Sequence, residues 1–319
     1  MTIKLILGTN NIGAHGKISS YDDVKDILSL FEKTGNNLLD TAYIYPAPYS
    51  GEAETILGNL DVTKNGKFVI NTKVNSFKDG SHHPDQIFKS VEEQFKRLKL
   101  GKVHTLYLHA PDRTISFEDS HRAINELYKQ GKFEKFGISN YSPGEIQGFI
   151  DRASKYGWVA PSSYEGLYNI VSRRAETELL PILRSANIEF YAYSPLASGF
   201  FSNIKRGQEP PKGGHFDPTT FNGSFTQSWF FKDSLFTAVE KLEKLGAKFG
   251  IPNNAIALRW LRHHSQLKHD DGILVGYSKI TQLSQNLEYL DQGPLPDEIV
   301  ASIDEMWVQI EKDAPKATM

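Results

Sequence analysis

The chain of 319 residues contains no cysteine. This absence excludes disulfide bonds, thiolate nucleophiles and zinc sites built on sulfur, and it fits a reducing compartment. Apolar runs are also short, since no stretch approaches the roughly 18 uninterrupted apolar residues of a membrane-spanning helix. The apolar residues 1–8 lack the layout of a secretory signal. We therefore expect a cytoplasmic protein without membrane association.

A strong excess of charge of either sign is missing as well. The formal net charge is -2 at pH 7 and the isoelectric point is near 6.6, so the chain has no overall field that would attract nucleic acid or anionic lipid. By contrast, 39% hydrophobic and 12% aromatic residues can bury a large core, which excludes disorder over most of the chain. The function is therefore expected to reside in a local site.

Short apolar runs with β character alternate along the chain with longer stretches of helical period. Eight such runs occur, at residues 3–9, 37–42, 67–74, 104–110, 133–140, 162–168, 188–194 and 272–277. Helical stretches follow most of them, at residues 20–34, 84–98, 117–130, 143–156, 172–185, 233–249 and 253–264. This alternation is typical of parallel βα units. It predicts an α/β fold, a single (β/α)8 TIM barrel that forms one domain over residues 1–319.

Two segments fall outside this alternation. Residues 198–232 are rich in Gly, Pro and Phe and are much longer than an ordinary βα connection, so we expect a lid loop after the seventh strand. A disordered surface excursion is the alternative, although its aromatic side chains would be costly to leave in water. Residues 291–319 are expected to form a C-terminal tail with one helical stretch at 297–311.

Polar side chains gather where the predicted strands end, which is where a barrel of this kind carries its site. Asp40, Lys73 and His109 end three successive strands, and Tyr45 follows the first of them. A tyrosine has an unperturbed pKa of about 10, and a nearby ammonium lowers that pKa. Lys73 is therefore expected to act on Tyr45, Asp40 to hold Lys73, and His109 to donate a hydrogen bond to a substrate oxygen. This set suits protonation of a carbonyl oxygen during reduction by hydride.

Each of these residues has a structural alternative. Asp40 can cap a turn, Lys73 can be an ordinary ion-pair partner, and His109 can be a buried structural histidine. Their joint placement at successive strand ends favours the catalytic interpretation.

Two other patterns suggest different chemistry. Adjacent histidines could indicate a metal, but such neighbours do not share a helical face and no third ligand is evident, so no metal site is predicted. Two glutamates could serve a glycosidase on the same fold, but one of them falls in a helical stretch that is expected to face away from the mouth. These residues are His82, His83, His263 and His264 for the metal, and Glu165 and Glu178 for the glycosidase.

Five segments around the strand ends form a specific combination. They are Leu-Asp-Thr-Ala-Tyr-Ile-Tyr at 39–45, Asn-Thr-Lys at 71–73, Leu-Tyr-Leu-His-Ala-Pro-Asp at 106–112, Gly-Lys-Phe-Glu-Lys-Phe-Gly-Ile-Ser-Asn-Tyr at 131–141 and Phe-Tyr-Ala-Tyr-Ser-Pro-Leu at 190–196. The combination strongly resembles the aldo-keto reductase superfamily, from about residue 8 to about residue 290. Residues 168–181, with Glu-Thr-Ile-Leu-Gly at 54–58, are most similar to its aflatoxin-aldehyde reductase branch.

The resemblance implies roles for the four strand-end residues. Tyr45 would be the general acid in carbonyl reduction, Lys73 its pKa partner, Asp40 the partner of that lysine, and His109 the group that orients the carbonyl. The resemblance also implies an NADP(H) cofactor, with NAD(H) less favoured, and a small-molecule carbonyl substrate. Tyr45, His109 and Trp229 are the expected substrate contacts, and a monomer or homodimer is expected.

Cofactor contacts are implied along the barrel mouth. The carboxamide would be held by Ser139, Asn140 and Glu165, and the nicotinamide ring would stack on Tyr193. The pyrophosphate loop is matched by Ser194, Pro195, Leu196, Ser198 and Gly199, with Lys205 as a nearby charge, and the adenosine end by Gly276, Ser278, Gln282 and Asn286. A helix N-terminus at 279–281 would favour a phosphate there.

Three features depart from the family pattern. Glu165 stands at the position of a glutamine, and an ionised carboxylate cannot donate to the carboxamide, so an altered cofactor affinity or orientation is expected. The loop at 46–54 is longer than in the related branch, and Gln282 occupies a position at which many relatives have arginine. Two alternatives stay open: a pathway reductase or isomerase of narrow specificity, and a cofactor-sensing regulatory subunit with little turnover.

Overall fold

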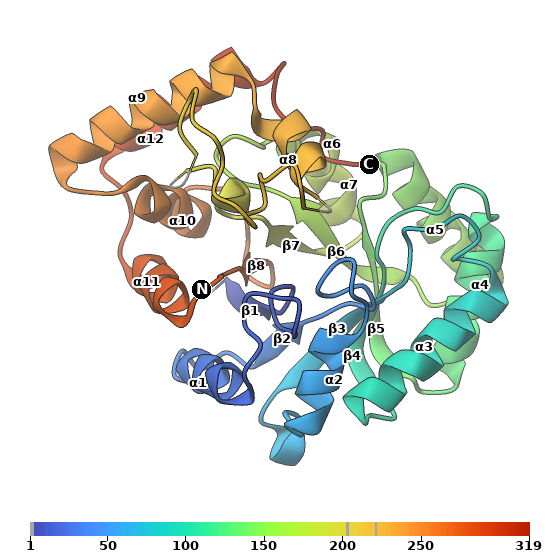
Figure 1. Ribbon diagram of the computed structural model, residues 1–319. Coiled ribbons are helices and arrows are strands. Elements are labelled where there is room, and N and C mark those ends of the chain that lie inside the picture. The colour runs from blue at the N-terminus through green and yellow to red at the C-terminus, as the bar shows by residue number, and fades with distance from the viewer. Residues whose placement is uncertain (1–2, 202–203, 221) are drawn as a thin grey trace.

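Eight parallel strands in the computed structural model, which describes residues 3–201, 204–220 and 222–319, pair in sequence order. The first strand also pairs with the last, with Leu5 opposite Ile273, so the sheet closes into a barrel (Figure 1). The strands are β1 (Lys4–Gly8), β2 (Leu38–Asp40), β3 (Val69–Val74), β4 (Val103–Leu108), β5 (Phe133–Ser139), β6 (Pro161–Leu167), β7 (Glu189–Tyr193) and β8 (Gly272–Val275). The predicted (β/α)8 TIM barrel is confirmed.

Helices surround the barrel (Figure 1). Within the described ranges, the α-helices are α1 (Tyr21–Glu32), α2 (Glu52–Asn59), α3 (Pro84–Leu98), α4 (Phe117–Lys129), α5 (Pro143–Tyr156), α6 (Ala175–Glu178), α7 (Leu180–Ser185), α8 (Gly223–Phe230), α9 (Asp233–Phe249), α10 (Asn253–His263), α11 (Ile280–Asp291) and α12 (Asp297–Ile310). Short 3-10 turns occur at η1 (Lys64–Gly66) and η2 (Ala197–Gly199). No helix in the described part of the chain has the length and apolar character to span a membrane.

Local sequence signals explain where these helices begin. Ser20 accepts a hydrogen bond from the backbone of Asp23 at the start of α1. Ser142 and Glu145 form a reciprocal capping box at the start of α5, and Pro143 occupies its first turn. The apolar faces of the helices contribute to the main core, which forms outside the barrel.

The inside of the barrel holds a second, smaller core. Ile6, Leu38, Tyr107, Tyr191 and Leu274 pack together there. Glycines make room for the large rings, because a Cβ at Gly137 would lie 2.3 Å from the ring of Tyr107, and one at Gly272 would lie 3.0 Å from the ring of Tyr191. The lower interior is therefore mainly apolar, with paired polar groups such as the Tyr107 hydroxyl, which lies 2.6 Å from Ser163 Oγ.

The prediction of one continuous helix at 172–185 is wrong, because the structure has two helices there, α6 and α7. Leu179 ends one and begins the other, and Pro181 lies in the first turn of α7. Proline cannot donate the backbone hydrogen bond that a continuous helix would need, so the break falls here.

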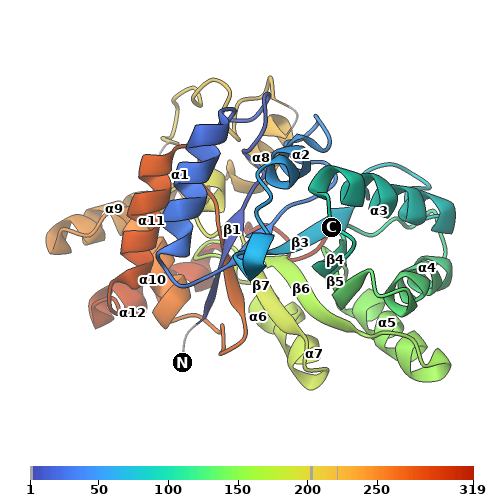
Figure 2. The same ribbon diagram turned by 90° about the horizontal axis from the view of Figure 1, so that it is seen from below.

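The expected lid segment is partly structured. Residues 202–203 and 221 lie outside the described residues, and α8 forms within the remainder. Phe200 packs against Phe216 and Phe230 in an aromatic cluster. Figure 2 shows this segment in yellow at the top of the view, on the same side as α8. The described part of 198–232 is thus anchored by its aromatic side chains, which argues against the disordered alternative.

The expected C-terminal tail carries the helix α12, which packs against α9 (Figure 1). Beyond this helix the chain returns to the barrel mouth, where the backbone N–H of Met319 donates to the carbonyl of Asn140 at 3.2 Å. The tail therefore contacts the strand end that was assigned to the cofactor carboxamide.

Two buried histidines should make the fold sensitive to acid. Burial lowers the pKa of His82 and of His121 to about 4, opposed in part by Asp112 and by the carbonyl of Val159 respectively. In the unfolded chain these groups titrate near about 6.5, so between the two values the unfolded state binds protons that the native state excludes. The free energy of unfolding should fall by about 3 kcal/mol per histidine as the pH drops through this window.

Urea denaturation at a series of pH values measures this effect. His121→Gln should flatten the pH dependence, whereas His83→Gln, which replaces an exposed neighbour of His82, should leave it unchanged. An unfolding free energy that stays level between pH 7 and 5 would contradict the assignment.

Candidate active site

A buried ion pair lies where β2 and β3 end. The Lys73 ammonium donates to both carboxylate oxygens of Asp40, at 2.6 and 2.5 Å, and to the carbonyl of Thr41 at 3.0 Å. Both side chains are fully buried. Burial disfavours the charged lysine, but the Asp40 carboxylate, the largest opposing influence, helps to outweigh it and raises the pKa of Lys73. The expected contact between Asp40 and Lys73 is therefore present, and the lysine stays cationic.

Glu165, on β6, is a third member of this cluster. Its Oε2 lies 3.3 Å from the Lys73 ammonium, while its Oε1 is buried without a hydrogen-bond partner. Burial, followed by the nearby Asp40, raises the pKa of Glu165 well above its ordinary value, although Lys73 lowers it. The protonated form of this carboxyl is therefore favoured, and a neutral carboxyl can donate as well as accept.

Tyr45 stands above the ion pair at the mouth and is partly exposed. The Lys73 ammonium lies 5.3 Å from the centre of its ring. The ammonium lowers the pKa of Tyr45, as expected from the sequence, but desolvation is stronger and raises that pKa overall, with Asp40 and Glu165 adding to the rise. The phenol is therefore protonated in this state of the protein and can act as a proton donor.

His109 faces Tyr45 across the mouth, with ring centres 5.7 Å apart and planes at 82°. Its backbone N–H donates to Ser76 Oγ at 3.1 Å, and its carbonyl accepts from Asn140 Nδ2 at 3.0 Å. Burial lowers the pKa of His109 well below its ordinary value, and Lys73 and His82 lower it further. The imidazole is therefore neutral and can donate through one ring nitrogen without carrying a charge.

Ser76 and His82 lie beneath His109 and were not predicted from the sequence as part of the site. Ser76 Oγ lies 2.7 Å from His82 Nε2, and the backbone N–H of His82 donates to Asp112. His82 belongs to a doublet that was considered only as a metal ligand, and its contact with a serine six residues earlier leaves no recognisable motif. No group of three His, Asp or Glu side chains suited to a metal occurs among the residues that the structure describes.

The nicotinamide end of the predicted cofactor site is assembled at the ends of β5 and β7. Asn140 donates to Ser139 Oγ at 3.0 Å and accepts from the Tyr193 hydroxyl at 2.8 Å. Both Ser139 and Asn140 are buried, whereas Tyr193 is partly exposed. Together with the unpaired oxygen of Glu165, these groups offer a polar rim beside an aromatic face, which fits a carboxamide attached to a flat ring.

The predicted pyrophosphate loop follows β7. Ser194, Ala197, Ser198 and Gly199 all have positive φ, at 52°, 47°, 59° and 97°. The backbone N–H groups of Ala197 and Gly199 donate within the turn, to the carbonyls of Ser194 and Leu196 at 2.9 Å each. An anion bound here would therefore use the other N–H groups of the loop. Asn169 fixes the start of the loop by donating to the carbonyl of Ser194 at 2.9 Å. The remaining predicted members, Pro195 and Leu196, lie within this turn.

The predicted adenosine end lies between β8 and α11. The backbone N–H and the hydroxyl of Ser278 both donate to Gln282 Oε1, at 2.9 and 2.7 Å. Asn286 donates to the carbonyl of Gly276 at 3.1 Å. Lys279 precedes α11 and makes no side-chain cap, so the helix N-terminus is left available to a phosphate.

Other residues singled out from the sequence lie apart from this arrangement. Lys205 forms an exposed ion pair with Glu243 on α9 at 2.8 Å, so a cofactor contact would require that pair to break. Trp229 packs on Phe225, with ring centres 4.6 Å apart. Glu178 lies 3.5 Å from Arg174 on the surface, which agrees with the reason for setting the glycosidase aside.

Exposed aromatic side chains occur in the segments near the mouth, including Tyr49, Phe77 and Phe225. Phe77 touches His109, with ring centres 4.9 Å apart.

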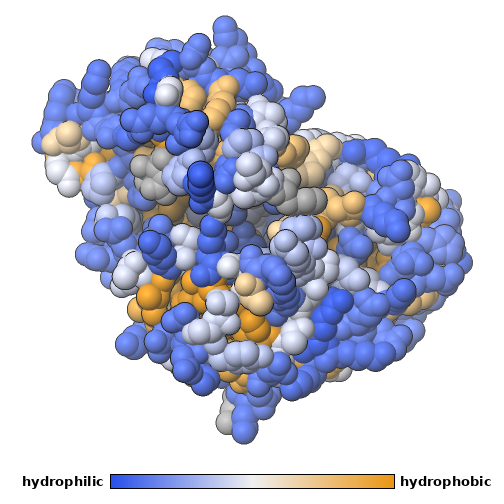
Figure 3. Space-filling view, viewed as in Figure 1, coloured by the Kyte–Doolittle hydropathy of each residue, from blue (hydrophilic) through white to orange (hydrophobic). Residues whose placement is uncertain are grey.

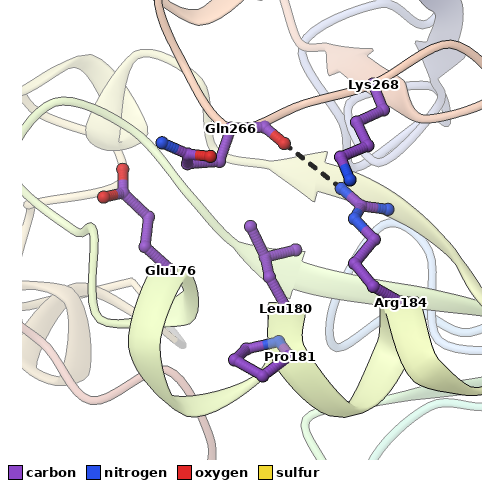
Figure 4. A pocket seen from close by; sticks show the side chains of 6 residues that line it. All are labelled: Glu176, Leu180, Pro181, Arg184, Gln266 and Lys268. Atoms are coloured by element: carbon purple, nitrogen blue, oxygen red, sulfur yellow. Dashed lines mark hydrogen bonds between the residues drawn. The ribbon is translucent and has the colours of Figure 1, made fainter.

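The molecular face in Figure 3 is mostly hydrophilic, with hydrophobic residues gathered in a few patches. A separate pocket shown in Figure 4, lined by Glu176, Leu180, Pro181, Arg184, Gln266 and Lys268, contains none of the predicted site residues.

The chain is similar in sequence to known proteins over most of its length. The model of the aldo/keto reductase family matches residues 4–308. "Oxidoreductase sirO" of Leptosphaeria maculans is 35% identical over 98% of this chain and 95% of its own length. "Aflatoxin B1 aldehyde reductase member 2" of Homo sapiens is 35% identical over 89% and 82%, and "Aldo-keto reductase pigE" of Monascus ruber is 32% identical over 96% and 94%. The chain therefore belongs to the aldo/keto reductase family of oxidoreductases.

Proposed function

We propose that this protein is an NADP(H)-dependent reductase that converts an aldehyde or ketone into an alcohol, with Tyr45 as the proton donor. The observation that carries the proposal is the placement of Tyr45 at the barrel mouth beside the buried ion pair of Lys73 with Asp40 and opposite His109. The family membership supports an oxidoreductase that acts on a carbonyl group.

The proton step follows from these charges. His109 donates a hydrogen bond to the carbonyl oxygen and directs it toward the Tyr45 hydroxyl. As negative charge develops on that oxygen, Tyr45 transfers its proton, and the Lys73 ammonium stabilises the phenolate that forms. Asp40 keeps the ammonium in place through two hydrogen bonds. A neutral His109 is essential here, because an imidazolium would compete with Tyr45 as the acid.

The cofactor would supply the hydride that reduces the carbonyl carbon. Ser139, Asn140 and Glu165 would hold its carboxamide, and Tyr193 would provide the face on which its ring stacks. The loop at 194–199 and the N-terminus of α11 would bind its phosphates. Gln282 is already bonded to Ser278, so we assign the 2′-phosphate to the free backbone N–H groups at this helix start and to Lys279.

The substrate side of the site favours apolar carbonyl compounds. Phe77 and Tyr45 flank His109, and Trp229 would reach the substrate if the segment at 198–232 closes as a lid. Two relatives are named as aflatoxin B1 aldehyde reductases, which favours an aldehyde. We further propose a cytoplasmic protein that is a monomer or a homodimer, which gel filtration coupled to light scattering would distinguish.

Titration of the intrinsic tryptophan fluorescence with NADPH and with NADH tests the proposal. We expect saturable quenching with tighter binding of NADPH, followed by loss of nicotinamide absorbance when an aldehyde is added. Binding without turnover on any aldehyde would favour a narrow pathway enzyme or a cofactor-sensing subunit. Absence of binding would contradict the proposed function.

A further inference from the structure

The Glu165 carboxyl joins two parts of the site that are otherwise separate. On one side, its Oε2 lies 3.3 Å from the ammonium of Lys73. On the other side, its Oε1 is buried and has no hydrogen-bond partner. Glu165 also lies two residues before Leu167, which pairs with Tyr193 across β6 and β7. The carboxyl therefore lies between the ion pair and the aromatic platform that was assigned to the nicotinamide ring.

The charges in this cluster do not balance if every acid is ionised. Lys73 supplies one positive charge, and Asp40 already takes two of its hydrogen bonds. A second carboxylate at Glu165 would leave an uncompensated charge in a nearly dry interior, because Glu165 is only 2% exposed. A neutral Glu165 removes that charge, and burial together with Asp40 raises its pKa in the same direction.

Among the residues that the structure describes, Lys73 is the one cation that influences Glu165. The titratable groups that influence Glu165 come from four strands or their ends: Asp40 and Tyr45, Lys73, Tyr107, and Tyr191 and Tyr193. All of these except Lys73 are acids. An added positive charge beside Tyr193 would therefore be the missing partner of an ionised Glu165.

We propose that Glu165 holds a proton in the free protein and in the complex with reduced cofactor, and loses it to solvent when oxidised cofactor binds. The inference rests on the proposed function, because it requires a nicotinamide ring on Tyr193. The oxidised ring carries a positive charge, whereas the reduced ring is neutral. Only the O–H bond of the carboxyl breaks, the proton passes to water, and nothing is oxidised or reduced in this step.

The two protonation states give Glu165 two modes of contact. The neutral carboxyl donates and accepts, as the amide of a glutamine does, so the reduced cofactor meets a neutral partner. The ionised carboxylate accepts only, but it attracts the cationic ring in a region of low dielectric. Through this residue the affinity for the oxidised cofactor should therefore rise with pH, whereas the affinity for the reduced cofactor should not.

Isothermal titration calorimetry in two buffers of different ionisation enthalpy measures the protons released on binding. Binding of NADP+ to the wild-type protein near neutral pH should release up to one proton more than binding to Glu165→Gln, and binding of NADPH should show no such excess. The comparison with Glu165→Gln also removes the contribution of the cofactor's 2′-phosphate, which titrates near about pH 6 in both proteins. Tyr45→Phe is the matched control and should retain the excess release.

The pH dependence of affinity gives a second readout. Between the pKa values of Glu165 in the free and bound states, the affinity of the wild-type protein for NADP+ should increase by up to about tenfold per pH unit relative to Glu165→Gln. Equal proton release by the two proteins, or loss of the excess in Tyr45→Phe, would overturn the proposal. If Glu165→Gln fails to fold, the wild-type protein is titrated with NAD+ in place of NADP+, because NAD+ lacks the 2′-phosphate. Binding of NAD+ without proton release then overturns the proposal. Failure to bind any of these dinucleotides would instead refute the proposed function.

Discussion

Replacing Tyr45 by phenylalanine is expected to lower kcat by at least about a hundredfold and to leave the Kd for NADPH nearly unchanged. A positioned general acid contributes a factor of this size or larger. The phenol is held protonated by desolvation, and His109 faces it at 5.7 Å between ring centres, so removal of one oxygen atom deletes the donor while the ring still packs. Steady-state kinetics with an aldehyde, together with fluorescence titration, separates the two effects.

Tyr43→Phe is the matched control. Its hydroxyl donates to Glu93 on α3 and its ring stacks on Arg97, so the substitution removes a phenolic oxygen outside the proposed proton path. Turnover in Tyr43→Phe should stay within a fewfold of the wild-type value. If Tyr45→Phe retained comparable turnover, the assignment of Tyr45 as the acid would be refuted.

Replacing Lys73 by methionine should destabilise the fold by about 3–5 kcal/mol, because it leaves buried carboxyl groups without their cation. Asp40 would lose two hydrogen bonds and its only close counter-charge among the described residues. Turnover should fall as well, since the phenolate at Tyr45 would lose the ammonium that stabilises it. Urea denaturation at neutral pH measures the first effect, and kcat measures the second.

Two further variants make this result interpretable. Lys96→Met removes an exposed ion pair with Glu92 and should leave the denaturation midpoint essentially unchanged. The double variant Asp40→Leu/Lys73→Met removes both charges, so it should recover part of the stability without recovering turnover. A Lys73→Met protein as stable as the wild type would show that the ion pair is not the buried, charged pair described above.

The alternation of residue types was sufficient to predict the barrel, because each strand is a short apolar run and most are followed by a helical stretch. It was insufficient at 172–185, where the apolar pattern continues through Leu179 although Pro181 interrupts the backbone hydrogen bonds. It also missed α8, whose Gly, Ser and Thr residues have low helix propensity and whose stability comes from packing of Phe230 on Phe200.

The residues that meet at the candidate site could be predicted from the sequence, but their protonation states could not. Asp40, Tyr45, Lys73 and His109 each end or follow a strand, so their convergence follows from parallel topology alone. The neutral state of Glu165 depends on how many carboxyls share one ammonium and on the loss of water, and neither is visible before the chain is folded. The contacts of Ser76 with His82 and with the backbone of His109 likewise depend on the path of the loop between β3 and α3.

Closure of the sheet between β1 and β8 sets the order in which a nascent chain can become complete. The strand ends that carry Asp40, Lys73 and His109 leave the ribosome before residues 272–275 are made. Until then, β1 and the latest strand present unpaired backbone edges, and such edges can pair with another chain. Premature termination before β8 should thus yield an aggregation-prone fragment rather than a smaller working enzyme.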